Sequence, residues 1–131
     1  MKPNFTGTWK ADVAKSYFAG APPKVLLVSI AHDGDVLREE MQVTRSDDSE
    51  QQILFECSTS GTSHAMLNGD NIRCNTSWNG NELLIETWPE LGSRRLHLCD
   101  HWSLSEDRMV LSMQHRDGDL KGQFVVFNRQ L

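Results

Sequence analysis

The chain has 131 residues, of which 38% are hydrophobic and 24% charged, and its formal net charge is −5. These values indicate a globular chain that can bury its own core, and the acidic balance argues against a nucleic-acid partner, whose phosphates need a basic surface. No apolar run approaches the roughly 20 residues of a membrane-spanning helix. The opening MKPNFTGTWK lacks the apolar run of a signal peptide. The chain has three cysteines, Cys57, Cys74 and Cys99, and this small, odd number argues against a disulfide framework. We therefore expect a reducing, cytoplasmic location.

Alternating apolar and polar residues between turn residues predict β-strands along most of the chain. Strands are expected near residues 5–13, 24–32, 35–44, 51–58, 71–78, 82–88, 94–104, 109–116 and 120–129. We expect a short helical turn or covering loop over 14–23, where Gly and paired prolines end regular structure, and a loop over 58–70. Hairpin connections predict one all-β domain over 1–131, an up-and-down antiparallel β-barrel of about eight to ten strands. A two-sheet sandwich is the alternative.

Turn residues predict the strand registers. Asp33-Gly34 and Asn79-Gly80 are typical of two-residue type I′ turns, and two further turns are expected at 105–107 and at Asp117-Gly118. The resulting pairs include Ile30 with Leu37, Thr76 with Leu83, Trp102 with Leu111, and Leu111 with Phe124. In each predicted hairpin the apolar residues fall on one face of the sheet.

Two short motifs resemble a known family. The stretch FTGTWK (5–10) resembles the Gly-x-Trp opening of the lipocalins and fatty-acid-binding proteins, the calycin group, and VVFNRQ (125–130) resembles their last strand. DHWSLSED (100–107) is similar to bacterial lipocalin-like domains. The resemblance implies a barrel that binds small molecules, with Trp9 and Arg129 in a cation–π contact at its closed end. The predicted turn register, in contrast, places Arg129 on the face opposite Phe124.

The same registers turn Asp100 toward the barrel interior, in an otherwise apolar stripe. A buried carboxylate needs a partner, and His115 is its diagonal neighbour on the next strand. Glu39 interrupts its own apolar stripe in the same way. The sequence therefore predicts a polar cluster in an apolar pocket. Candidate ligand-binding residues are Phe55, Trp78, Leu98, Asp100, Trp102, Met113, His115 and Phe124. A structural role for Asp100, bonded to a backbone group or a Trp indole, is the alternative.

Three functions remain open from the sequence. The first is binding of a small, mostly apolar molecule inside the barrel, with no cofactor. The second is an isomerase, cyclase or hydratase on the same barrel, in which Asp100, His115 and Glu39 act as acid and base. The third is an interaction module with a filled barrel.

A metal site is a further alternative, because His97, Cys99 and His101 share one strand face. His97 and His101 lie about 13 Å apart on a strand that rises ~3.3 Å per residue, too far to bind one ion. Outward residues on adjacent strands, such as Glu86, form no evident ligand set. A polar outer face is therefore favoured over a metal site. Cys57 and Cys74 are expected to be two buried thiols that face each other.

Overall fold

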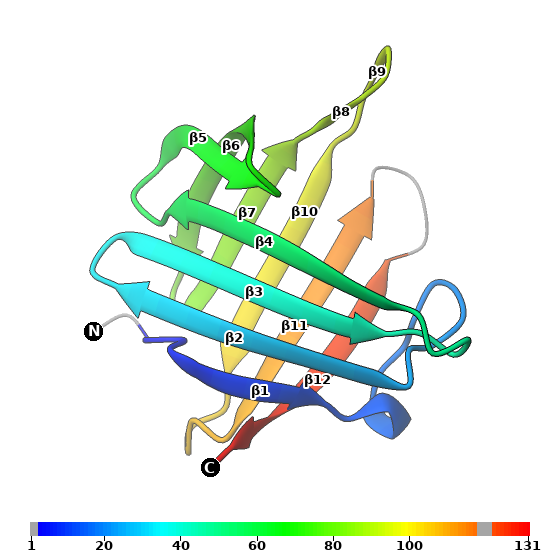
Figure 1. Cartoon of the computed structure of the whole chain (residues 1–131). Helices are drawn as coiled ribbons and strands as arrows, with labels where there is room; N and C mark the ends of the chain where they lie inside the picture. Colours follow the sequence, from blue (N-terminus) through cyan, green and yellow to red (C-terminus); the bar gives the residue numbers. More distant parts are fainter. Residues whose placement is uncertain (1–2, 118–121) are drawn as a thin grey trace.

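The computed structural model describes residues 3–117 and 122–131. Over these residues ten strands close into a barrel in the order β1-β12-β11-β10-β7-β6-β5-β4-β3-β2 (Figure 1). They are β1 (Gly7–Ala11), β2 (Val25–Asp33), β3 (Val36–Thr44), β4 (Glu50–Ser58), β5 (Thr62–Leu67), β6 (Asp70–Asn79), β7 (Glu82–Trp88), β10 (Leu98–Leu104), β11 (Val110–Asp117) and β12 (Gln123–Gln130). A hairpin of β8 (Glu90–Leu91) and β9 (Arg94–Arg95) projects from the barrel between β7 and β10.

Every neighbouring pair of barrel strands is antiparallel, and β1 pairs with β12 to close the wall. Strands that follow one another in the sequence are neighbours in the barrel. Two further neighbouring pairs are not consecutive in the sequence: β7 with β10, which are separated by the β8–β9 hairpin, and the closing pair β1 with β12. The predicted up-and-down antiparallel barrel is confirmed, and the sandwich alternative is wrong. Among the described residues, no helix has the length and apolarity needed to cross a bilayer.

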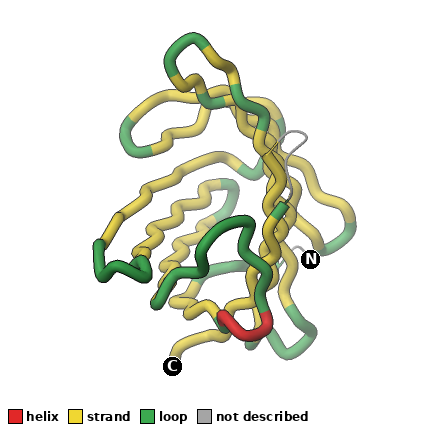
Figure 2. Tube along the Cα trace, turned by 90° about the vertical axis from the view of Figure 1, so that its right-hand side faces the viewer, coloured by secondary structure: helices red, strands yellow, loops and turns green. Residues whose placement is uncertain are grey.

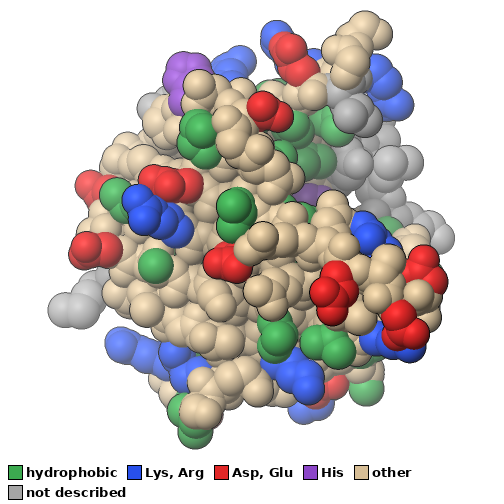
Figure 3. Space-filling view, viewed as in Figure 1, with side chains coloured by type: hydrophobic (Ala, Val, Ile, Leu, Met, Phe, Trp, Pro, Cys, Tyr) green, Lys and Arg blue, Asp and Glu red, His purple; other side chains and the backbone are tan. Residues whose placement is uncertain are grey.

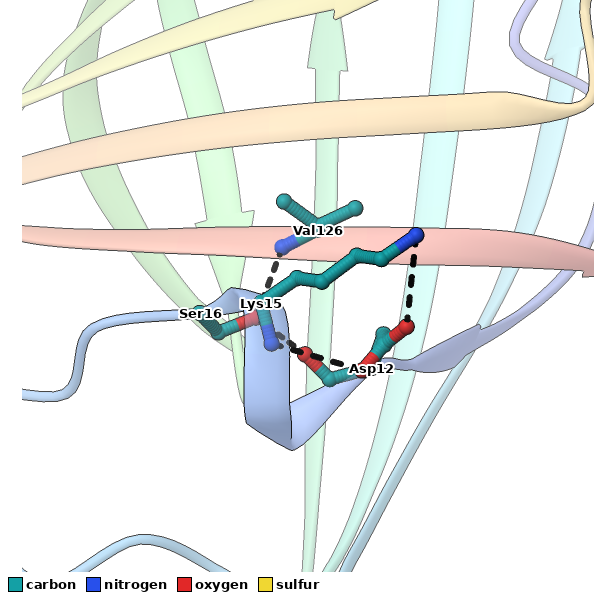
Figure 4. Close-up of polar contacts among 4 residues, drawn as sticks. All are labelled: Asp12, Lys15, Ser16 and Val126. Carbon is teal, nitrogen blue, oxygen red and sulfur yellow. Dashed lines mark hydrogen bonds and ion pairs between the residues drawn. The ribbon is translucent and has the colours of Figure 1, made fainter.

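A short segment after β1 extends the wall along β12. The 3-10 turn η1 (Val13–Lys15) begins after Asp12, whose side chain accepts a hydrogen bond from Lys15 N. Ser16 Oγ donates to Asp12 O at 2.7 Å and accepts from Val126 N at 2.9 Å (Figure 4). Tyr17 then forms a bridge with Phe124. This is the short helical turn expected near 14–23, and Figure 2 shows it in red at the lower end of the barrel.

Two strand predictions are wrong. The expected loop over 58–70 contains β5, in which Ala65 is buried and pairs with Ile72. Residues 58–70 are rich in Ser, Thr and Gly and so resemble a loop in composition, although alternate positions of β5 face the core. The strand expected over 94–104 is interrupted, because Leu96 N donates to Pro89 O at 2.8 Å and strand pairing resumes only at Leu98.

Three hairpin registers differ from the prediction by one step. The two-residue loops are 34–35 and 80–81, one position later than expected, so Ile30 pairs with Glu39 and Thr76 with Ile85. The β10–β11 pairing shifts in the same way and places Asp100 directly opposite His115. Because each partner moves by two residues, the inward and outward faces stay as predicted.

The predicted face of β12 is wrong. The register pairs Leu111 with Phe127 rather than Phe124, and this shift of three residues exchanges the two faces. Val125 and Phe127 are buried, whereas Phe124 is 42% exposed. Gly118 of the predicted Asp117-Gly118 turn lies outside the described part of the chain.

The corrected face brings Arg129 to Trp9. The Arg129 guanidinium carbon lies 4.3 Å from the centroid of the fully buried Trp9 ring. Arg129 also donates to Thr6 O and Arg108 O, each at 2.9 Å, and Trp9 Nε1 donates to Phe5 O at 3.1 Å. These contacts tie the two ends of the described chain together at one end of the barrel.

Aromatic rings fill the barrel above this contact. The fully buried Phe5 ring stacks on Trp78 at 6.2 Å and meets the edge of Trp102 at 5.6 Å. The His32 ring lies 5.8 Å from Phe5 and 6.5 Å from Trp78, and its Nδ1 accepts from Phe5 N at 3.3 Å. The barrel is therefore closed by packed side chains at this end.

Candidate functional site

A cavity of about 390 Å³ lies inside the barrel, away from the aromatic cluster. Most of its lining is apolar: Leu26, Met41, Ile53, Phe55, Leu67, Ile72, Ile85, Leu98, Met113, Val125 and Phe127. The polar lining residues are Glu39, Gln51, Asn68, Thr87, Asp100, His115 and Gln123. In Figure 3 the upper part of the visible face is recessed, with hydrophobic side chains on the wall of the recess and histidine atoms inside it.

Three of the polar residues belong to one electrostatic cluster. Asp100 on β10 and His115 on β11 are directly paired residues, and Asp100 Oδ1 and His115 Nδ1 are in hydrogen-bond contact. Glu39 on β3 interacts electrostatically with both of them. The structural alternative for Asp100 placed its carboxylate on a backbone group or an indole, but its partner is His115. Trp102 Nε1 has no hydrogen-bond partner within the described residues.

Glu39 has the most perturbed environment in this cluster. Its Oε2 is buried, with no hydrogen-bond partner in the described part of the chain. Burial, followed by repulsion from Asp100, raises the pKa of Glu39 to about 8, and His115 opposes this shift. The carboxyl therefore holds a proton at neutral pH while the cavity is empty, so it can both donate and accept a hydrogen bond.

The predicted ligand-binding residues divide into two groups. Those that line the cavity are Phe55, Leu98, Asp100, Met113 and His115. Trp78 and Trp102 point inward as expected but pack in the aromatic cluster at the closed end. Phe124 lies on the outer face, which corrects its predicted orientation, and Val125 and Phe127 occupy the inner positions of β12.

The sequence reasoning missed several lining residues. Leu67 and Asn68 were overlooked because β5 was taken for a loop, although the Asn68-Gly69 pair is itself a turn signal. Gln51 is the second residue of β4 and Gln123 the first of β12, and neither carries a sequence signal that separates it from surface glutamines. The alternation of β3 did single out Glu39, which supplies the buried carboxyl.

The candidate metal ligands lie on the outer face. His97 Nε2 is 2.9 Å from Glu86 Oε2 and 3.5 Å from Cys99 Sγ. The donor atoms of these three residues all lie within 4.8 Å of one another. His101 does not join them, because its Nδ1 is 2.7 Å from Glu82 Oε1. The structure thus brings together two of the three candidate ligands and adds Glu86, which the sequence analysis placed on the outer face without assigning it to a ligand set.

Two other depressions lack such an interior cluster. One of about 680 Å³ crosses β1 to β5, where Leu54 and Met66 are exposed and Arg38 pairs with Glu56 at 3.2 Å. The other, of about 640 Å³, lies between β6 and the β8–β9 hairpin and is lined by Trp88 and Arg95 among others. Glu39 borders the first depression as well as the cavity inside the barrel, but Asp100 and His115 line only the cavity.

Comparison with solved structures relates the barrel to proteins of very different sequence. The lipid binding protein LBP-8 of Caenorhabditis elegans superposes with a TM-score of 0.65 at 9% identity, over 96% of this chain and 95% of that one. A secretory abundant heat soluble protein of Ramazzottius varieornatus gives 0.62 at 13% identity, over 98% of each chain. A point mutant of the fluorescent protein UnaG gives 0.63 at 15% identity, over 97% of this chain and 96% of that one.

The sequence itself has no such match. No protein-family model matches the chain, and no curated protein matches it significantly. The likeness is therefore one of fold, and it agrees with the resemblance seen in FTGTWK and VVFNRQ. The chain has a calycin-like β-barrel fold.

Proposed function

We propose that the protein binds a small, mostly apolar molecule in the cavity of its barrel. The observation that carries this proposal is a largely apolar space inside the barrel with three polar groups gathered in one cluster, which is the usual form of a ligand site. Its volume of about 390 Å³ is at the lower end of the range for such sites. The similar fold of a lipid binding protein supports the same function.

The polar cluster favours one class of ligand. Among the described lining residues there is no lysine or arginine, while Glu39 and Asp100 are both carboxyl groups. A ligand carboxylate would place a second negative charge beside Asp100, and His115 already contacts Asp100. An amine or hydroxyl could instead donate to the unpartnered Glu39 Oε2. The ligand we propose therefore carries a hydrogen-bond donor, neutral or cationic, on an apolar body.

A matched pair of substitutions tests the location of the site. Ile53 lines the cavity, whereas the adjacent Leu54 is exposed on the outer face. Ile53→Trp is expected to abolish binding of the neutral dye Nile red by filling the cavity, and Leu54→Trp to leave it unchanged. Loss of binding only in Leu54→Trp would move the site to the outer depression. No Nile red binding by the unmodified protein would favour a filled barrel.

Ligand class is tested by competition on the unmodified protein. Decanol and decylamine should displace Nile red at concentrations at least about tenfold lower than decanoate, a difference of about 1.4 kcal/mol. The three competitors share one alkyl chain, so the difference reports the polar end alone. Equal or tighter binding of decanoate would contradict the proposed role of Glu39 and Asp100 while leaving the cavity site intact.

Acid–base catalysis is a second candidate function. Two features of the cavity favour it. Asp100 and His115 are in direct contact, and Glu39, which lines the same cavity, loses its proton near pH 8. A ketone probe, 2-decanone in heavy water, would gain deuterium beside its carbonyl if such groups removed protons there. Asp100→Asn should lower that exchange by about 10²–10⁴-fold but change Nile red binding little. Exchange that is no faster than in buffer would remove this candidate.

We further propose that the protein functions in the cytoplasm. Cys57 and Cys74 are both free and buried, and a hydrogen bond that Cys57 donates to Cys74, together with burial, raises the pKa of the Cys57 thiol. Two thiols in contact without a disulfide fit a reducing compartment. The net charge of −5 also supports a small molecule, rather than nucleic acid, as the partner. Thiol titration of protein isolated from cells under alkylating conditions tests the location, since a disulfide there would contradict it.

A further inference from the structure

A compact group of metal-binding side chains lies on the outer wall of the barrel. Glu86 on β7 and Cys99 on β10 are directly paired across the two strands, and His97 immediately precedes β10. Since neighbouring residues on a strand face opposite sides, Cys99 points away from the cavity that Asp100 lines. This group is therefore separate from the proposed ligand site.

The donor atoms are arranged as an ion would need them. Glu86 Oε2 lies 2.9 Å and Cys99 Sγ 3.5 Å from His97 Nε2, and all three donors lie within 4.8 Å of one another. A tetrahedral zinc ion with bonds of about 2.0–2.3 Å holds its ligand atoms roughly 3.3–3.7 Å apart. Small side-chain rotations would thus bring the three atoms around one ion.

The scaffold holds these side chains in place. The His97 ring stacks on Trp88 with 5.0 Å between centroids and 4° between planes. The Arg73 guanidinium carbon lies 4.6 Å from the centroid of the same Trp88 ring. Backbone pairing between β7 and β10 places Glu86 and Cys99 directly opposite each other. A site whose ligands are positioned in advance loses less conformational entropy when it binds.

We propose that Glu86, His97 and Cys99 bind one divalent ion of the zinc type, with a fourth position open to water. A thiolate and an imidazole together select zinc or cobalt over calcium or magnesium, which prefer oxygen ligands. Three protein ligands and one open position are typical of zinc sites that exchange their fourth ligand. Arg116 pairs with Cys99 from β11, and its positive charge lies next to the site.

Cobalt(II) titration of the full chain tests this site, because a cobalt–thiolate bond gives a charge-transfer band that cobalt in water lacks. One equivalent of cobalt should produce the band, and added zinc should remove it. Cys99→Ser and His97→Gln are expected to lose the band, and Arg116→Gln to bind cobalt more tightly. His101→Gln is the matched control and should keep the band, since His101 contacts Glu82 instead.

Two outcomes would overturn the proposal. One is the absence of any charge-transfer band in the unmodified protein. The other is a band that survives in Cys99→Ser, which would assign the cobalt to Cys57 and Cys74 in the core. Nile red binding measured on the same variants shows whether the barrel remains intact, because this outer site is separate from the cavity.

Discussion

Replacement of Glu39 by glutamine should stabilise the protein, and increasingly so as the pH rises. The Glu39 carboxyl has a pKa of about 8 in the folded chain, against an ordinary value of 4.5. Between these two values the folded state keeps a proton that the unfolded state has released, so the free energy of unfolding falls as the pH increases. Glutamine has nearly the same shape, keeps hydrogen-bonding capacity and does not ionise.

The size of the effect follows from the same two values. At about 1.4 kcal/mol for each pKa unit, the cost of Glu39 to the folded state is below about 1 kcal/mol at pH 5. It rises to about 3 kcal/mol at pH 7 and about 5 kcal/mol at pH 9. These are upper values, because water that enters the cavity would solvate the carboxylate.

Urea unfolding of both proteins at pH 5, 7 and 9 measures this difference. Glu40→Gln is the matched control, since Glu40 follows in the same strand, contacts Gln52 and faces outward. That control should show the same pH dependence as the unmodified protein. A stability difference between Glu39→Gln and the unmodified protein that stays constant from pH 5 to pH 9 would refute the burial argument.

Three further substitutions test the closed end and the wall. Burial lowers the pKa of His32 below its ordinary value of 6.5, so below that pH the unfolded state binds a proton that the folded state does not bind. The free energy of unfolding should therefore fall below pH 6.5. His32→Gln should reduce this loss, as measured by urea unfolding at pH 5 and pH 7.5. Gly7 has φ +154°, and an added Cβ would lie 2.4 Å from Arg129 Nη1. Gly7→Ala should lower the free energy of unfolding by about 1–3 kcal/mol. The loss should be smaller in an Arg129→Ala background if the clash is its cause. The buried Thr76 hydroxyl accepts from Gly61 N at 3.1 Å, so Thr76→Val should cost about 1–3 kcal/mol in thermal unfolding, and an unchanged midpoint would contradict this role.

Strand faces could be predicted from the sequence better than strand partners. The glycine that takes the positive φ in the first hairpin is Gly34, at +59°, and it occupies the first loop position rather than the second. This difference moves every partner by two residues, which leaves the period-2 face unchanged. The prediction that Asp100 points inward is therefore correct despite the register error. Its direct pairing with His115 could be seen only in the structure.

The face of β12 could not be derived from hydrophobicity. Phe124 and Val126 on one side, and Val125 and Phe127 on the other, are all apolar, so alternation does not select a face. The resemblance carried the missing information, because an Arg129 that packs on Trp9 requires Val125 and Phe127 to point inward. The structure contains that contact at 4.3 Å.

Alternation also does not tell how deep in the barrel an inward residue lies. The side chains of Trp78 and Trp102 point inward, as predicted. They pack with Phe5 at the closed end, however, and do not line the cavity. Depth depends on register and strand tilt, which no single strand encodes. Because these large rings occupy the end above Trp9 and Arg129, the free volume is confined to the part of the barrel that contains Glu39, Asp100 and His115. Under the proposed function, a bound molecule would have to be small, and a polar group that enters the cavity would lie near this cluster, so we expect the charge of that group to influence which molecules bind.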